Sequence, residues 1–68
     1  MINNLSPRKI EICKYIANGL KNEEIAKIIK VSKHTVKAYV SSIINDACAR
    51  NRTQLAYILG KENFDSKI

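Results

Sequence analysis

The chain has 68 residues, which is one domain at most, because domains usually contain about 100–150 residues. A chain of this length leaves little room for a pocket of roughly 300 Å3 or more beside its core, which argues against a self-contained enzyme. Twelve lysines and arginines against six acidic residues give a net charge of +6, which favours a polyanionic partner, nucleic acid before an anionic membrane surface.

A first helix is predicted over about residues 7–18. Ser6 can act as its N-cap, and Pro7 fits the first helical position, where the missing N–H costs nothing. Asn18 and Gly19 supply a stop, because both tolerate left-handed backbone. The apolar residues of this segment recur at helical spacing and form the expected buried face: Ile12, Cys13, Ile16, Ala17 and Leu20.

A second helix is predicted over about residues 22–30. Asn22 is its expected cap, and Glu23 and Glu24 in its first turn oppose the positive end of the helix dipole. Its expected buried residues are Ile25, Ala26 and Ile29.

Only Val31 and Ser32 separate this helix from a third one, predicted over about residues 33–47 with Ser32 as its cap. So short a turn makes the two helices cross steeply, as in a helix-turn-helix. The expected inner face of the third helix consists of Val36, Val40, Ile43 and Ala47.

A fourth helix is predicted over about residues 52–60. Asn51 and Gln54 have the spacing of a capping box, and Gly60 is the expected terminator. Its apolar face is expected to contain Leu55, Ile58 and Leu59, and the tail over residues 61–68 is expected to fray. The sequence therefore predicts an all-α fold of four short helices, with residues 1–68 forming a single domain.

The cysteines and the histidine predict neither a disulfide framework nor a metal site. Cys13 and Cys48 lack a C-x-x-C spacing, and His34 is the only histidine. We expect both thiols to be small buried hydrophobes in a reducing compartment. No apolar run approaches the roughly 18 residues of a membrane span. We therefore expect a cytoplasmic protein with no metal, no cofactor, no small-molecule ligand in this domain and no membrane contact.

The third helix and the turn before it carry an unusual charge pattern. No acidic residue lies between Glu24 and Asp46, and this window holds Lys27, Lys30, Lys33, His34 and Lys37. On a helical period, the residues facing outward or sideways are Lys33, His34, Lys37, Ala38, Ser41 and Ser42. Short polar side chains at its start and on this face, Ser32, Thr35, Ser41 and Ser42, can contact phosphates or base edges.

A polar helix face is more often a solvated surface than a binding site. Here the tight turn, the acid-free window, the net charge and the small size together favour DNA. An alanine on the outer face lets a helix seat in a major groove about 12 Å wide. For His34, a phosphate contact and simple exposure to solvent are equally consistent with the sequence. For Tyr39, the ring can pack partly in the core or its hydroxyl can contact a phosphate, and the sequence favours neither.

The residues also resemble a known family. The LuxR/GerE-type helix-turn-helix pattern is matched over about residues 5–60, and its motifs are Leu5-Ser6-Pro7-Arg8, Ile16-Ala17-Asn18-Gly19-Leu20, Asn22-Glu23-Glu24-Ile25-Ala26, Thr35-Val36-Lys37 and Arg52-Thr53-Gln54. The resemblance implies a four-helix, sequence-specific DNA-binding transcription regulator. Some members stand alone at this length, and Met1 close to the first motif favours a whole protein over an output domain.

The resemblance also implies roles for individual residues. Base reading in the major groove falls to Lys37, Ala38 and Ser41. Phosphate contacts are expected, from the resemblance or from the charge pattern, at Asn22, Ser32, Lys33, His34, Thr35, Tyr39 and Ser42. The fourth helix commonly forms a homodimer contact, which makes Leu55, Tyr57 and Ile58 the candidates. The implied partners are double-stranded DNA, a second copy of the chain and RNA polymerase.

Several positions depart from the family pattern. Lys9 stands where the family usually has Glu, which predicts the loss of an internal ion pair. Asp46-Ala47-Cys48-Ala49 replaces a typical Lys-Leu-Gly-Val, so we expect the third helix to end differently or to run further. Ile10, Ile28 and Ile44 stand at positions that are often polar in the family. They are either scattered exposed residues or part of a further association surface.

Three hypotheses remain open. The leading one is a dimeric DNA-binding regulator whose recognition helix, about residues 33–47, enters the major groove. The second is a protein-interaction module that keeps the fold but binds a protein partner. The third is a promoter-reading piece related to sigma factors, which would need the polymerase core to bind.

Overall fold

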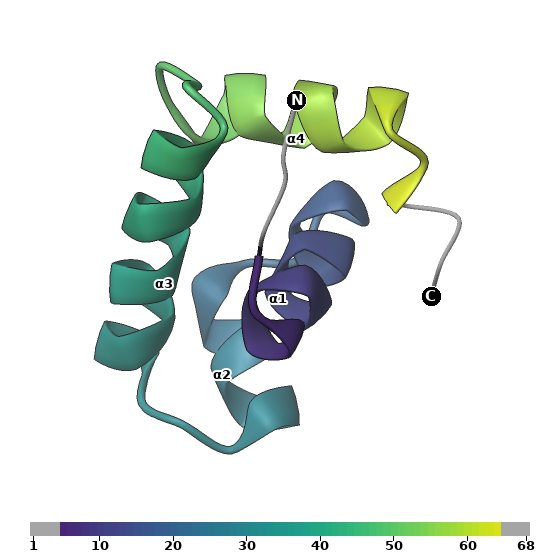
Figure 1. Cartoon of the computed structure of the whole chain (residues 1–68). Coiled ribbons are helices and arrows are strands. Elements are labelled where there is room, and N and C mark those ends of the chain that lie inside the picture. Colours follow the sequence, from purple (N-terminus) through teal and green to yellow (C-terminus); the bar gives the residue numbers. More distant parts are fainter. Residues whose placement is uncertain (1–4, 65–68) are drawn as a thin grey trace.

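The structure is a computed structural model that describes residues 5–64. It contains four helices and no strand within these residues: α1 (Pro7–Ala17), α2 (Asn22–Ile29), α3 (Lys33–Asp46) and α4 (Arg52–Lys61). The all-α, four-helix prediction is therefore confirmed. In Figure 1, α4 crosses one end of α3, and α1 and α2 fill the angle between them. α1 packs against α3 and α4, and α2 packs against α3.

Three of the four predicted helix starts are confirmed by a side chain that caps the helix. Its oxygen accepts a hydrogen bond from the backbone N–H three residues later at Ser6 (3.3 Å), Ser32 (3.0 Å) and Asn51 (2.9 Å). The predicted cap of α2 is wrong, because Asn22 is already helical and Lys21 occupies the cap position. There the carboxylate of Glu24 accepts from the Lys21 N–H at 2.7 Å.

The end of α3 keeps the geometry that the family pattern assigns to glycine. Cys48 adopts left-handed backbone (φ 55°). Its N–H donates to the carbonyl of Asn45 (3.1 Å), and the N–H of Ala49 donates to the carbonyl of Ile44 (3.0 Å). These two bonds form a Schellman motif. The expectation that α3 would end differently or run further is therefore wrong: α3 ends at Asp46, and a cysteine occupies the glycine position.

The end of α4 differs from the prediction. Gly60 lies within the helix, which continues to Lys61, and Asn63 takes the left-handed conformation (φ 63°). Phe64, in the segment expected to fray, packs partly against the core. The rest of that segment, 65–68, lies outside the described residues.

The core is built from the predicted inner faces of all four helices. The buried hydrophobic residues are Ile12, Cys13, Ile16, Ile25, Ala26, Ile29, Val36, Val40, Ile43, Ala47, Leu55 and Leu59. Ala17, Leu20 and Ile58, also predicted there, are partly buried at its edge. The prediction that both thiols are buried holds for Cys13 and is wrong for Cys48, which lies exposed at the α3–α4 corner.

An ion pair that the sequence predicts to be lost is present. The ammonium of Lys9 in α1 donates to Asp46 Oδ2 (3.1 Å) at the end of α3 and to Ser42 Oγ (2.7 Å). The predicted loss of an ion pair is therefore wrong. Lys9 replaces an acidic residue of the family pattern, but Asp46 replaces a basic one, so the two positions still carry opposite charges. Within residues 5–64, no helix is long and apolar enough to cross a lipid bilayer.

Candidate nucleic-acid interface

The turn between α2 and α3 fixes how the third helix leaves the body. Lys30 ends α2 with left-handed backbone (φ 59°), and the Val31 N–H returns to the carbonyl of Ala26 (3.1 Å). Val31 packs partly against the core, and Ser32 then caps α3. This turn is pinned at both ends by hydrogen bonds, so α2 and α3 are held as one helix-turn-helix unit.

The two sides of α3 are sharply different. Val36, Val40 and Ile43 face the core and are buried. The opposite side, here called the outer face of α3, consists of exposed residues: Lys33, His34, Lys37, Ala38 and Ser41. Thr35 is also exposed, and its hydroxyl shares a 2.9 Å hydrogen bond with that of Ser32. The outer face carries three basic or titratable side chains and no carboxylate, so its electrostatic potential favours an anion.

A shallow hollow of about 300 Å3 runs along one flank of this face. It is lined by Lys9, Thr35, Ala38, Tyr39 and Ser42. Tyr39 is half-buried and packs partly against the core. The Ser42 hydroxyl accepts the bond from Lys9 described above, so it is held in place by α1. The sequence did not point to Lys9 as a neighbour of α3, because the contact joins residues 33 positions apart.

Asn22 lies half-buried at the start of α2, beside the first residue of α4. Its amide oxygen accepts a hydrogen bond from Arg52 Nη1, and Arg52 Nη2 donates to the carbonyl of Leu20 at 2.5 Å. Burial lowers the pKa of the Arg52 guanidinium, because the charged form loses solvation there. Sequence reasoning missed this role of Arg52, which it used only as part of a motif.

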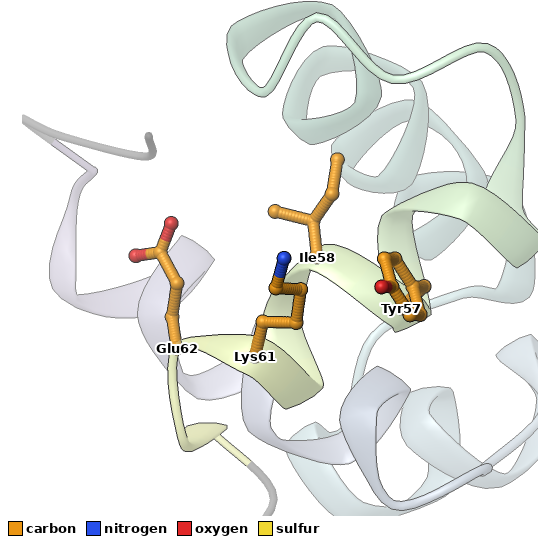
Figure 2. Close-up of a pocket in the computed structure, with 4 residues that line it drawn as sticks. All are labelled: Tyr57, Ile58, Lys61 and Glu62. Carbon is orange, nitrogen blue, oxygen red and sulfur yellow. The ribbon is translucent and has the colours of Figure 1, made fainter.

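The predicted dimer residues of α4 fall into two groups. Leu55 has no exposed surface and belongs to the core, so its assignment to a subunit contact is wrong. Tyr57 is 66% exposed, and Ile58 is half-buried. Figure 2 shows Tyr57, Ile58 and Lys61 on α4, with Glu62 following, around a shallow surface hollow. The Lys61 ammonium lies 5.5 Å from the centre of the Tyr57 ring, a cation–π contact.

Comparison with known proteins identifies the fold and its usual role. The pattern described as "Bacterial regulatory proteins, luxR family" matches residues 3–59. The two-component response regulator PprB of Pseudomonas aeruginosa is 37% identical over 59 residues, which cover 87% of this chain and 22% of that protein. The transcriptional regulatory protein LnrK of Bacillus subtilis is 42% identical over 53 residues (78% and 24%).

The nitrate/nitrite response regulator NarL of Escherichia coli is 33% identical over 61 residues, which cover 90% of this chain and 28% of that protein. The chain thus spans between 22% and 28% of the length of these three relatives. No solved structure gave a significant match. The described residues form four helices in the expected order, with a helix-turn-helix at α2–α3, and the family pattern matches most of the sequence. The chain therefore belongs to the luxR family of bacterial regulatory proteins.

Proposed function

We propose that this chain binds double-stranded DNA sequence-specifically in the cytoplasm and regulates transcription, with α3 as the recognition helix in the major groove. The observation that carries the proposal is the outer face of α3, which is exposed and acid-free and lies directly opposite a buried apolar stripe. One side of α3 is anchored in the core and the other side is cationic. Such a helix can enter the major groove, where the phosphates of both DNA strands attract its positive charge.

Three exposed side chains of α3 are proposed to read bases. Lys37 can donate to the O6 and N7 acceptors of guanine, and Ser41 can donate to or accept from either base type. The methyl group of Ala38 can contact the thymine methyl and leaves room for close approach of the helix. All three lie on exposed positions of one helix face. Their common orientation supports the assignment.

The proposed phosphate contacts surround this face. They are Asn22, Ser32, Lys33, His34, Thr35, Tyr39 and Ser42. Lys33 in the first turn of α3 is exposed and supplies charge, and the exposed His34 beside it can offer a ring N–H donor. Ser32 and Thr35 supply hydroxyls beside them, and Ser42 lies on the flank next to Lys9. Phosphate contacts of this kind fix register without reading sequence.

Two copies of the chain are proposed to bind two half-sites about one helical turn, or roughly 34 Å, apart. The exposed Tyr57 and the half-buried Ile58 on α4 are the proposed contact residues, in keeping with the exposed aromatic ring. RNA polymerase, which the family resemblance implies as a partner, is a further proposed contact of the DNA-bound protein. Any signal input would come from outside the residues described.

Selection of bound duplexes from a random oligonucleotide pool tests the function most directly. A recurrent, two-fold symmetric motif is expected, together with binding that weakens steeply as salt rises. Recovery of no motif, with equal affinity for all duplexes, would contradict sequence-specific recognition.

A second function, a protein-interaction module, is favoured by exposed apolar side chains outside α3. Ile28 on α2 is 48% exposed, and Ile10 lines an apolar hollow with Lys14, Glu62 and Phe64. Tight binding to a protein, without any salt-sensitive binding to DNA, is the result that would favour this alternative over the first.

A further inference from the structure

Arg52 joins the start of α4 to the chain around the start of α2, which lies 30 to 32 residues earlier. It is the first residue of α4, and its guanidinium reaches the turn between α1 and α2, where Nη2 donates to the carbonyl of Leu20 at 2.5 Å. Nη1 donates to the side-chain oxygen of Asn22, the first residue of α2. The guanidinium is thus held at both terminal nitrogens and has one orientation relative to Asn22.

The chemistry of the two groups fixes how the Asn22 amide points. A guanidinium has donors only, so the amide must present its oxygen to Arg52. The amide nitrogen sits on the other side of the same carbon, so it is turned away from Arg52 and keeps two N–H donors. No hydrogen bond from this nitrogen occurs among residues 5–64.

We propose that Arg52 is a positioning residue of the DNA interface: by holding the amide oxygen of Asn22, it aims the amide nitrogen at a DNA phosphate. This inference rests on the proposed function, in which Asn22 contacts phosphate. Arginine suits the task because its planar fork spans two acceptors at once, whereas the single ammonium of lysine cannot reproduce that geometry.

The alternative is that Arg52 only fastens α4 to the turn before α2. Two substitutions separate the roles. In Asn22→Asp, the introduced carboxylate still accepts from the guanidinium, so the link and the fold are retained. It has no donor to offer, however, and it repels phosphate. In Arg52→Lys, Asn22 is unchanged but the bidentate grip is lost.

The experiment is phosphate-ethylation interference on a duplex selected from the random pool, with melting curves for each variant. In the wild type, a set of ethylated phosphates is expected to block binding. In Asn22→Asp, one of these per half-site is expected to stop blocking, because ethylation now removes a repelling charge. The same phosphate is expected to stop blocking in Arg52→Lys. Affinity of Asn22→Asp is expected to fall about tenfold, equally on selected and random duplexes.

Arg8→Lys is the matched control, because Arg8 in α1 pairs with Glu11 (3.4 Å), its one ion pair within residues 5–64, and takes no part in the proposed interface. It is expected to keep the complete wild-type pattern. If Arg52→Lys loses helix content by circular dichroism, Arg52→Gln replaces it, since its amide keeps one donor nitrogen without the guanidinium fork.

The inference is overturned if ethylation of every wild-type phosphate still blocks binding by the Arg52 variant. It is also overturned if ethylation still blocks binding by Asn22→Asp at all of these phosphates. A third contradicting result is an equal loss of interference at all phosphates in the Arg52 variant, since a residue that only fastens α4 would act in that way. Failure of the wild type to bind any duplex instead overturns the proposed function, so the two failures are distinguishable.

Discussion

The Lys9 ammonium at the start of α1 pairs with the Asp46 carboxylate at the end of α3, and the two charges are exchanged relative to the Glu and Lys of the family pattern. Their atoms lie 3.1 Å apart, and the side chains are 24% and 37% exposed. Because the pair is partly solvated, its contribution to stability is about 0.2–1 kcal/mol. The two departures from the family pattern are therefore complementary in charge, and they form an ion pair.

The pair predicts a recovery in a double substitution. Lys9→Glu alone places two carboxylates together and is expected to lower the free energy of unfolding by about 1 kcal/mol, and Asp46→Lys places two ammonium groups together with a similar effect. The double variant restores an ion pair and is expected to unfold within about 0.5 kcal/mol of the wild type. Urea denaturation of the four proteins measures this. Losses that simply add in the double variant would show that the pair contributes nothing.

Cys13 lies in the core close to this pair, and its titration predicts a loss of stability in alkaline solution. Burial raises the pKa of its thiol to about 11 from the ordinary 9.0; the nearby Asp46 carboxylate adds to the rise, and Lys9 opposes it. The folded state therefore holds the proton more tightly than the unfolded state. This stabilisation is complete below pH 9 and is lost as the pH rises through about 11.

The measurement is the free energy of unfolding between pH 8 and 11 for the wild type and for Cys13→Ala. The alanine variant is less stable because of the cavity that it leaves. Its stability is nevertheless expected to fall less steeply over this range, because it has no thiol to ionise. Parallel pH profiles for the two proteins would remove Cys13 as a source of the alkaline loss.

Cys48 predicts a simple stabilising substitution. It has φ 55°, and an L-residue in left-handed backbone pays about 1 kcal/mol that glycine does not. Cys48→Gly is expected to raise the free energy of unfolding by about this amount, with the Schellman bonds retained. Cys48→Ala is the control, because it removes the thiol but keeps the Cβ. Equal stabilisation by alanine would trace the effect to the thiol rather than to the backbone.

Helix positions and core residues could be predicted because they depend on local pattern. The Ser6 and Ser32 caps lie three residues from the N–H groups they bind, and the inner face of α3 follows from its apolar period. Contacts such as Lys9 with Asp46 and Arg52 with Asn22 could not be predicted, because they depend on how the helices pack.

Two errors have the same physical origin. The apolar pattern predicts a buried Cys48 and a disturbed end of α3, yet the Schellman hydrogen bonds at this corner hold Cys48 in left-handed backbone with its side chain exposed. The family position of α4 predicts Leu55 in a subunit contact, yet Leu55 has no exposed surface. The conformational preference of a residue and its position in a family pattern do not show which of its atoms the other helices bury.

Lys37 and Lys33 are predicted to contribute to DNA binding in different ways. Both are exposed on α3. Lys37→Ala is expected to cost about 1–3 kcal/mol on the selected site and much less on random duplex, because a base contact is lost. Lys33→Ala is expected to weaken both duplexes alike and to reduce the slope of log affinity against log salt by about 1. Gel-shift titrations at two salt concentrations distinguish them. Equal losses on both duplexes for Lys37→Ala would remove it from base reading.

Tyr57 is predicted to control how many copies bind one site. Its ring is 66% exposed on α4, so a substitution there leaves the core intact. Tyr57→Glu places a charge in the proposed subunit contact, which disfavours its desolvation. Complexes with a two-half-site duplex are expected to change from cooperative binding of two copies to independent binding, measured by sedimentation and gel shift. Affinity for a duplex with one half-site is expected to stay unchanged, because α3 is untouched. Retained cooperativity would place the subunit contact elsewhere than on α4.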